Sequence, residues 1–444
     1  MLPHRNFGLR ISDCGFQPRL LEIRNPQSAI RNATFGPLDP LDPLDPLNLW
    51  TLDFGVHSHP MTARERVLDA LSHREPDRLP LDIGSARFTG MVKEAYEKLR
   101  AHLGFGEPGP IVDRMQQLVE MDEAVLQYLG ADVRSLGQGA PDRGGGEELG
   151  EDRYRDEWGV VRVKPPGSHY YDLAGCPLAG EITPAAIARY RWPDPTDPGI
   201  CRGLRARAEA LRKTDYAVMY NARFNVVHTM QYLRGFEDWF LDLGADHRLF
   251  ECLRDAILDV LVELNRRTLQ QVGDLIDVVA FGDDVGQQDR PVCSLANYRK
   301  LIRPALERSV ETIRAHTSAK ILYHTCGSVY RYMDDFIAIG IDAVNPVQVT
   351  ARDMEPARLK REFGDRICFW GAVDSHRVLP HGSPAEVAAE VRRLFEVMGQ
   401  GGGWILAAVH NVQPDVPPEN VRAMLAAGRQ CLYPRQQNRA AANL

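Results

Sequence analysis

Several common signatures are absent from this sequence, and each absence removes a class of protein. The 444 residues contain no CxxC pair, no P-loop, no GxSxG motif and no GxGxxG loop that opens a helix. The sequence therefore does not indicate a thioredoxin-like redox site, a P-loop nucleotide-binding site, the nucleophile turn of a serine hydrolase or a dinucleotide-binding fold. The glycine run GQGGGW (399–404) precedes a predicted strand, so it is interpreted as a turn. No apolar run approaches the roughly 20 residues that a membrane-spanning helix needs.

The chain also lacks an excess of basic charge. The chain has 53 Lys and Arg against 60 Asp and Glu, a net charge of −7, which disfavours nucleic-acid and anionic-membrane partners. No secretory apolar region is predicted near the start, where Arg5, Arg10 and Asp13 interrupt the sequence, so we expect a cytoplasmic protein. The eight cysteines are scattered, and we expect most to be free and buried. The sequence leaves the oligomeric state open.

The first sixty residues differ in pattern from the rest. Residues 37–48 read PLDPLDPLDPLN, and proline at every third position excludes a helix or a central strand. The pattern changes at Met61, where a helix is predicted with Thr62 as N-cap and Glu65 three residues later. We expect residues 1–60 to be disordered or a mis-called start; a polyproline docking tail is the alternative. Residues 61–434 are then the folded domain, and 435–444 a tail.

Eight short apolar runs recur after Met61, and each ends in polar residues or glycine. They are 79–84, 131–135, 216–222, 277–282, 320–324, 342–346, 367–371 and 404–409. Amphipathic helices are predicted between them, for example at 246–271 and 384–400. Eight strands that alternate with helices predict the α/β class and a (β/α)8 TIM barrel, with an open doubly wound sheet as the alternative. The long interval 136–215 predicts an excursion with a hairpin between strands two and three.

Polar residues gather at the predicted carboxyl ends of these strands, where a barrel places its active site. Candidate substrate-binding residues among them are Asp82, Arg87, Asn221, Arg223, Asn345, Gln348 and Asp374. Asp283 and Asp284 in GDDVGQQ are candidate catalytic residues. Adjacent residues of an extended chain point to opposite sides, so we expect one carboxylate to face the mouth and the other to cap the next helix.

The stretch ILYHTCGSVY (321–330) ends a predicted strand in a histidine and a cysteine. Residues i and i+2 of a strand point to the same side, so His324 and Cys326 can offer an imidazole and a thiolate to one zinc ion. His410, at the end of the last strand, is the candidate third ligand and a candidate catalytic residue. The alternative is a strand-capping histidine, a buried cysteine, and a loop histidine held by Asn411 or Asp415.

From Met61 to about Pro434 the chain resembles the uroporphyrinogen decarboxylase superfamily. The resemblance lies in ERVLDALSHREPDRLP, GDDVGQQ, ILYHTCGSVY, FWGAVDSHRVLP and HNVQPDVPPEN. It implies a (β/α)8 barrel and one of two activities: decarboxylation in haem biosynthesis, or zinc-dependent methyl transfer between corrinoid proteins and acceptors such as coenzyme M.

The methyltransferase branch is the closer of the two. Its HxC pair is matched by His324 and Cys326, and its third ligand, a cysteine, is replaced here by His410. The resemblance thus implies bound Zn2+ in a His2Cys set, with Asp283 or Asp284 completing the zinc shell or orienting a ligand. It also implies a small-molecule methyl acceptor. This chain has no corrinoid-binding DxHxxG motif, so a partner corrinoid protein would supply the methylcorrinoid.

The decarboxylase branch is matched less well. Its arginine-rich loop corresponds to DIGSARFTG here, which has only Arg87, and its tyrosine falls at Gln231, next to Tyr232. Its histidine is matched by His410, so a decarboxylase with Asp82 or Asp283 near the pyrrole nitrogens stays the alternative. A non-catalytic corrinoid- or tetrapyrrole-binding protein is the third possibility.

Overall fold

The structure is a computed structural model that describes residues 61–106 and 109–433. The predicted extension (1–60) and tail (435–444) lie outside the described residues, so both stay predictions. In the described part, no helix combines the length and the apolar character that crossing a bilayer requires.

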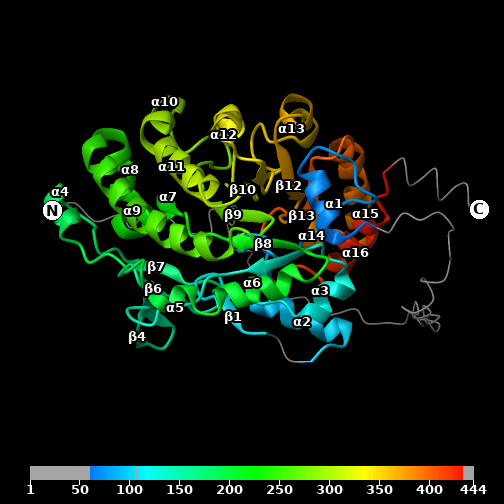
Figure 1. The fold of residues 1–444 in the computed structure, drawn as a ribbon, viewed down its shortest axis with the longest axis horizontal. Coiled ribbons are helices and arrows are strands. Elements are labelled where there is room, and N and C mark those ends of the chain that lie inside the picture. The colour runs from blue at the N-terminus through cyan, green and yellow to red at the C-terminus, as the bar shows by residue number, and fades with distance from the viewer. Residues whose placement is uncertain (1–60, 107–108, 434–444) are drawn as a thin grey trace, which may run out of the picture. The chain divides into compact units, whose positions relative to one another are not determined.

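Seven parallel strands form the central sheet (Figure 1), in the order β13-β12-β11-β10-β9-β8-β3. The strands are β3 (Val133–Leu136), β8 (Ala217–Asn221), β9 (Val278–Gly282), β10 (Lys320–His324), β11 (Ala343–Asn345), β12 (Cys368–Val373) and β13 (Trp404–Ala408). His324 pairs in register with Gly282 on one side and with Asn345 on the other. Because the strands are parallel, their polar carboxyl ends lie together at one end of the sheet.

Residues 80–82 connect the two outer strands of this sheet. Leu81 forms a parallel bridge with Leu406 of β13, and its carbonyl accepts the N–H of Asp132, just before β3, at 2.9 Å. The predicted strand 79–84 is therefore reduced to a single bridge. Pro80 has no N–H to donate, and Gly84 turns the chain with φ of 81°. The predicted α/β barrel is confirmed, with seven full strands and this short closing segment.

The helices that follow the strands agree with the predictions where these were specific. They are α1 (Ala63–Ala70), α2 (Lys93–Leu103), α3 (Glu123–Leu129), α4 (Pro184–Ala188), α5 (Pro198–Cys201), α6 (Leu204–Arg212), α7 (Val226–Arg234), α8 (Phe236–Ala245), α9 (His247–Val272), α10 (Leu295–Asn297), α11 (Arg303–Arg314), α12 (Met333–Ile339), α13 (Pro356–Phe363), α14 (Val378–His381), α15 (Pro384–Leu394) and α16 (Pro418–Gln430). Predicted helix 246–271 is α9, and 384–400 is α15 followed by a π-helical turn, Phe395–Gly399.

Local sequence explains where these helices begin. Thr62 and Glu65 form the predicted capping box of α1, each side chain satisfying the other's backbone N–H. Ser383 and Glu386 do the same for α15, where Pro384 occupies the first turn. Each box satisfies N–H groups that would otherwise lack a partner at a helix start.

The barrel interior is a separate apolar cluster built from alternate strand residues. Met219, Ala280 and Leu322 point inward, whereas their strand neighbours join the larger cluster under the helices. Val67 and Ala70 of α1 belong to the same interior cluster, so α1 closes the end of the barrel opposite the polar strand ends.

The excursion between strands two and three is an antiparallel sheet of four strands, which extends the predicted hairpin. Its strands are β4 (Glu147–Gly150), β5 (Arg153–Arg155), β6 (Val161–Val163) and β7 (Asp172–Gly175). A smaller hairpin of β1 (Ile111–Asp113) and β2 (Leu118–Val119) precedes α3. The excursion reaches the polar strand ends, because Glu157 pairs with Arg223 at 3.3 Å.

Candidate metal centre

His324 is the last residue of β10, and strand parity directs its side chain into the barrel mouth. Leu322, two residues earlier, lies in the barrel interior, and alternate residues share a side. His324 and Cys326 are both buried, with Nε2 of the histidine 3.6 Å from Sγ of the cysteine. Gly327 then turns the chain with φ of 85°, and a Cβ there would lie 2.5 Å from the Gly286 backbone carbon. The HTCG turn therefore requires glycine.

Asn345 fixes which nitrogen of His324 is available. Its Oδ1 lies 2.5 Å from His324 Nδ1, and its Nδ2 donates to the backbone oxygen of Trp370 at 3.0 Å. An amide oxygen can only accept, so Nδ1 must carry the proton. The lone pair of His324 is then on Nε2, which faces Cys326. A hydrogen bond of this kind is the usual outer support of a metal-binding histidine.

His410 joins this pair from the other side of the mouth. It follows β13, which is separated from β10 by two strands, yet donor atoms of His324, Cys326 and His410 all lie within 4.8 Å of one another. Burial and the nearby His324 lower the pKa of His410 to about 4, so its imidazole is neutral at pH 7. The side chain of Asn411 binds Gly90 and Gln116, so it does not hold His410 in the way the alternative interpretation required.

The three donors are of types that zinc accepts, and one separation between them matches a zinc site. With Zn–N near 2.1 Å and Zn–S near 2.3 Å, a tetrahedral ion separates nitrogen and sulfur ligands by about 3.5 Å. The observed distance from His324 Nε2 to Cys326 Sγ is 3.6 Å. The full set of donors lies within 4.8 Å, a wider limit than this spacing. Two imidazoles and one thiolate leave a fourth position for another ligand.

Asp283 caps a helix, as one of the two carboxylates was expected to do, but the helix is α7. This helix lies earlier in the chain, so the expectation of the next helix was wrong. Both Asp283 oxygens accept backbone N–H groups at 2.9 Å, from Val227 and His228 in the first turn of α7. The barrel brings the end of β9 beside this helix start, a proximity that sequence order does not reveal. Asp283 is thereby fixed and buried.

Asp284 faces the candidate metal centre. Its Oδ1 accepts the N–H of Cys326 at 2.8 Å and lies 3.7 Å from His324 Nε2. His228 lies between the two carboxylates, with Nδ1 3.2 Å from Asp283 and Nε2 3.5 Å from Asp284. Burial disfavours the charged forms of both His228 and Asp284, but their pairing outweighs this effect. The pKa of His228 is raised well above its usual value, and the pKa of Asp284 is lowered. An imidazolium between two carboxylates thus braces the loop beside Cys326.

Three predicted substrate-binding residues lie on the β3–β8 side of the mouth. Asn221 donates to a backbone carbonyl of the loop after the closing segment at 2.9 Å. Arg223 is mostly buried, and burial together with the charge of Arg87 lowers its pKa. Arg87 is half exposed and has only a long contact with Asp113, at 3.7 Å. The positive charge of Arg87 thus acts on Arg223.

Asp82 lies inside the barrel, where Trp370 Nε1 donates to its Oδ2 at 2.8 Å. Its Oδ1 has no partner within hydrogen-bonding geometry among the described residues. Burial raises the pKa of Asp82 to about 6, although Ser85 and Trp370 favour the charged form. The carboxyl group is 1% exposed, so substrate could reach it only from within the mouth.

Asp374 and Gln348 are buried, and each accepts hydrogen bonds from backbone N–H groups. Asp374 Oδ1 accepts the N–H groups of His376 and Arg377, at 2.7 and 3.2 Å, and so caps the turn after β12. Gln348 Oε1 accepts the N–H of Gly327 at 2.7 Å and so supports the HTCG turn. Substrate binding by these two residues stays a prediction.

Sequence reasoning missed two residues of the site, His228 and Phe88. The Phe88 ring stacks on His324, with centroids 4.4 Å apart and planes 16° apart. His228 lies in a helix, and no other ligand-type residue stands near it at a spacing typical of metal sites. Only the fold therefore reveals its two aspartate partners. Phe88 lies six residues after Asp82 in a loop, where an aromatic residue carries no signal for a histidine 236 positions away.

Comparisons with known proteins identify relatives of this chain. A family model described as uroporphyrinogen decarboxylase (URO-D) matches residues 181–431. A uroporphyrinogen decarboxylase of Pseudoalteromonas translucida is 25% identical over 181 residues, 41% of this chain and 47% of that protein. The methylcobamide:CoM methyltransferase MtaA of Methanosarcina barkeri is 26% identical over 151 residues, 34% of this chain and 41% of that protein. The chain thus spans less than half the length of these curated relatives.

Among solved structures, a methyltransferase from Methanosarcina mazei is similar in fold. The match covers 83% of this chain and 99% of that one, with a TM-score of 0.56 and 18% identity. At that identity the likeness supports the barrel architecture alone.

Proposed function

The chain belongs to the uroporphyrinogen decarboxylase family, and on that premise we propose that it is a zinc-dependent methyltransferase. It would move a methyl group between a corrinoid protein and a thiol or similar small-molecule acceptor. The observation that carries this proposal is the convergence of His324, Cys326 and His410 at the barrel mouth. A nitrogen and sulfur donor set suits zinc, on which the proposed methyl transfer depends.

The proposed ligands are His324 Nε2, the Cys326 thiolate and one ring nitrogen of His410. Zinc bound there would lower the pKa of a coordinated acceptor thiol, which makes a thiolate available at neutral pH. The neutral state of His410 at pH 7, which burial favours, leaves a lone pair for the metal.

The residues around the donors hold them ready. Asn345 keeps the proton of His324 on Nδ1, away from the proposed metal. Asp284 accepts the N–H of Cys326 and so fixes the backbone from which the thiolate projects. His228 keeps Asp284 ionised and in place, which makes it a positioning residue in this scheme. Asp283 acts through the start of α7 and not at the reacting atoms.

The relatives support this assignment in part. The name of the Methanosarcina barkeri relative describes a transfer that involves methylcobamide and coenzyme M. We infer a similar class of reaction here, with the corrinoid on a separate protein that docks over the mouth. Arg87 and Arg223 would then favour an acceptor that carries negative charge.

Decarboxylation of a porphyrinogen is the second candidate, because several relatives carry that name. It needs a carboxylate that meets the pyrrole nitrogens. Asp283 is engaged by the start of α7 and Asp82 is almost fully buried, so both fit this role less well. A protein that binds a corrinoid or tetrapyrrole without turnover is the third candidate.

One set of assays separates the three. Zinc-loaded full-length protein is mixed, without oxygen, with free methylcobalamin as donor and 2-mercaptoethanol as probe thiol. The methyl group passes to sulfur, two electrons stay on cobalt to give cob(I)alamin, and the thiol proton is released, so the visible spectrum changes. We expect this change in the wild type and in His73→Gln, and its loss in His324→Gln.

The other outcomes would contradict methyl transfer. Release of CO2 from uroporphyrinogen, with no demethylation of methylcobalamin, would establish the decarboxylase. Tight binding of cobalamin or porphyrin with neither product would establish a binding protein.

A further inference from the structure

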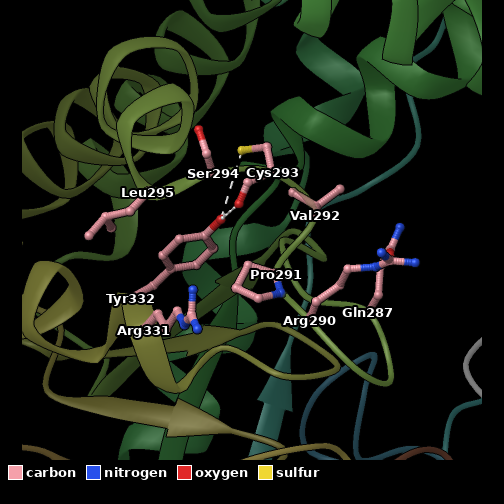
Figure 2. Close-up of a pocket in the computed structure, with 9 residues that line it drawn as sticks. All are labelled: Gln287, Arg290, Pro291, Val292, Cys293, Ser294, Leu295, Arg331 and Tyr332. Atoms are coloured by element: carbon pink, nitrogen blue, oxygen red, sulfur yellow. Dashed lines mark hydrogen bonds between the residues drawn. The ribbon is translucent and has the colours of Figure 1, made fainter.

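A pocket of about 500 Å³ opens between the loop after β9 and the loop after β10 (Figure 2). Both loops lie at the carboxyl end of the barrel strands, where (β/α)8 enzymes place their binding loops. The volume falls in the range of small-molecule sites, about 300–1,000 Å³. None of the three proposed metal ligands lines it, so it is a second hollow at the functional end of the barrel.

The walls of this pocket are already in place. Residues 285–292 form a tight hairpin, in which the N–H of Val292 donates to the carbonyl of Val285 at 2.9 Å. On the opposite wall, Tyr332 stacks on Tyr298 with ring centroids 3.9 Å apart. The Tyr332 hydroxyl donates to the carbonyl oxygen of Cys293 at 2.8 Å and so joins the two walls, as the dashed line in Figure 2 shows. A ligand would not have to organise these groups on binding.

The pocket is positively charged. None of the described residues that line it is acidic, and two of them are Arg290 and Arg331. Figure 2 shows these two side chains on either side of Pro291. Arg331 forms no ion pair with any residue that the structure describes. Arg290 has only long contacts within its own hairpin, 3.3 Å to Gln287 and 3.5 Å to Asp289.

The uncharged part of the lining is mostly apolar. Val292 and Leu295 lie partly buried against the main core, and Pro291, which is also partly exposed, completes this surface. Burial raises the pKa of Cys293, so its thiol is neutral and adds no negative charge. A ligand suited to this lining combines an anionic group with an apolar body.

We propose that this pocket binds a small organic anion. Its carboxylate or phosphate group contacts Arg331 and Arg290, and its apolar part packs on Pro291, Val292 and Leu295. This assignment does not rest on zinc or on methyl transfer, because none of these five residues belongs to the proposed metal centre.

The pocket is nevertheless connected to that centre through backbone hydrogen bonds. The carbonyl of Gln287 accepts the N–H of Ser328 at 2.7 Å, two residues after Cys326. Gln348, which supports the HTCG turn, donates to Gln288 Oε1 at 2.8 Å. The hairpin that carries Arg290 is thus attached to the turn that carries the proposed thiolate ligand.

Calorimetric titration of the full-length protein with phenyl phosphate tests the proposal. We expect saturable binding that weakens with added salt, because the contacts are exposed to solvent. Arg331→Gln should weaken it about tenfold or more, through the loss of a charge-assisted hydrogen bond. Arg290→Gln should have a smaller effect, because the Arg290 side chain already contacts Gln287 and Asp289. The matched control is Arg392→Gln, which removes an exposed arginine on α15, away from the pocket.

Two further probes define the ligand class. Benzoate should compete with phenyl phosphate if any oxyanion suffices, and its failure would restrict the pocket to phosphates. Inorganic phosphate should bind more weakly than phenyl phosphate, and equal affinity would contradict the apolar half of the assignment. The proposal is overturned if phenyl phosphate does not bind, or if Arg331→Gln and Arg392→Gln bind it equally while both melt as the wild type does.

Discussion

Two cysteine–histidine pairs lie at opposite ends of the same barrel, with the same spacing. At the mouth, Cys326 Sγ is 3.6 Å from His324 Nε2. At the other end, where β12 begins, Cys368 Sγ is 3.6 Å from His73 Nε2. In each pair the other ring nitrogen lies beside an oxygen, so Nε2 carries the lone pair in both. The distance within a pair therefore cannot decide which of them holds a metal.

The surroundings of the two pairs differ in the third group. His410 supplies another neutral donor at the mouth, whereas the charge of Lys360 acts on His73 at the other end. Burial also raises the pKa of Cys368 to about 12, which keeps its thiol protonated. Among the described residues, only the mouth group has three donors within ligand distance. A third donor, and not a short Cys–His distance, distinguishes a candidate metal site from a packed core pair.

The largest expected effect comes from changing one member of each pair. Cys326→Ser should weaken zinc binding by more than the 10- to 100-fold that is typical of an outer-shell change, because a ligand itself is lost. Cys368→Ser should leave the zinc affinity unchanged, because burial keeps the Cys368 thiol protonated and the described residues place no third donor beside it. Competition with a chromophoric chelator measures both affinities.

The comparison would fail in either of two ways. Equal zinc loss in Cys326→Ser and Cys368→Ser would mean that folding, not ligation, controls the metal. Unchanged affinity in Cys326→Ser would remove the mouth cysteine from the ligand set.

A middle-sized effect is expected at Asn345, which supports His324 and has no counterpart side chain beside His73. Asn345→Leu should weaken zinc binding about 10- to 100-fold, because the tautomer and orientation of His324 are no longer fixed. Asn420→Leu is the matched control, since it removes another buried asparagine that donates to two backbone carbonyls. Similar zinc affinities in the two variants would show that Asn345 acts only in folding.

How far the sequence predicts this architecture depends on the range of the contact. The placement of His324 and Cys326 followed from strand parity, and the helix start at Thr62 followed from local capping. The barrel was predicted from eight apolar runs, but the first run forms only one bridge because Pro80 cannot donate. The bracing of Asp284 by His228 joins positions 56 residues apart through the start of another helix, so no local pattern indicates it.

The smallest effect should appear in the pH dependence of stability. His228 has a raised pKa in the folded state, so its pairing stabilises the fold fully below its unfolded pKa, near 6.5, and less as pH rises through the folded value. The paired Asp284 has a lowered pKa, so the stabilisation that its carboxylate contributes to the fold is lost as pH falls below about 4. His228→Gln should therefore cost about 2 kcal/mol of unfolding free energy near pH 5.5, and less at higher pH.

Urea unfolding at several pH values measures this difference. The control is His316→Gln. His316 lies before β10, on the far side of the barrel from His228, and its ring contacts a helix carbonyl. A loss in His228→Gln that does not change with pH would rule out the charged pairing.

Zinc K-edge X-ray absorption on the purified full-length protein tests the central claim most directly. The proposed site predicts one zinc per chain, with one sulfur at about 2.3 Å and two imidazole nitrogens at about 2.0–2.1 Å. His410→Ala should remove one of the imidazoles and keep the sulfur. A zinc shell without sulfur, or a protein that takes up no stoichiometric zinc on reconstitution, would contradict a metal centre built from His324, Cys326 and His410.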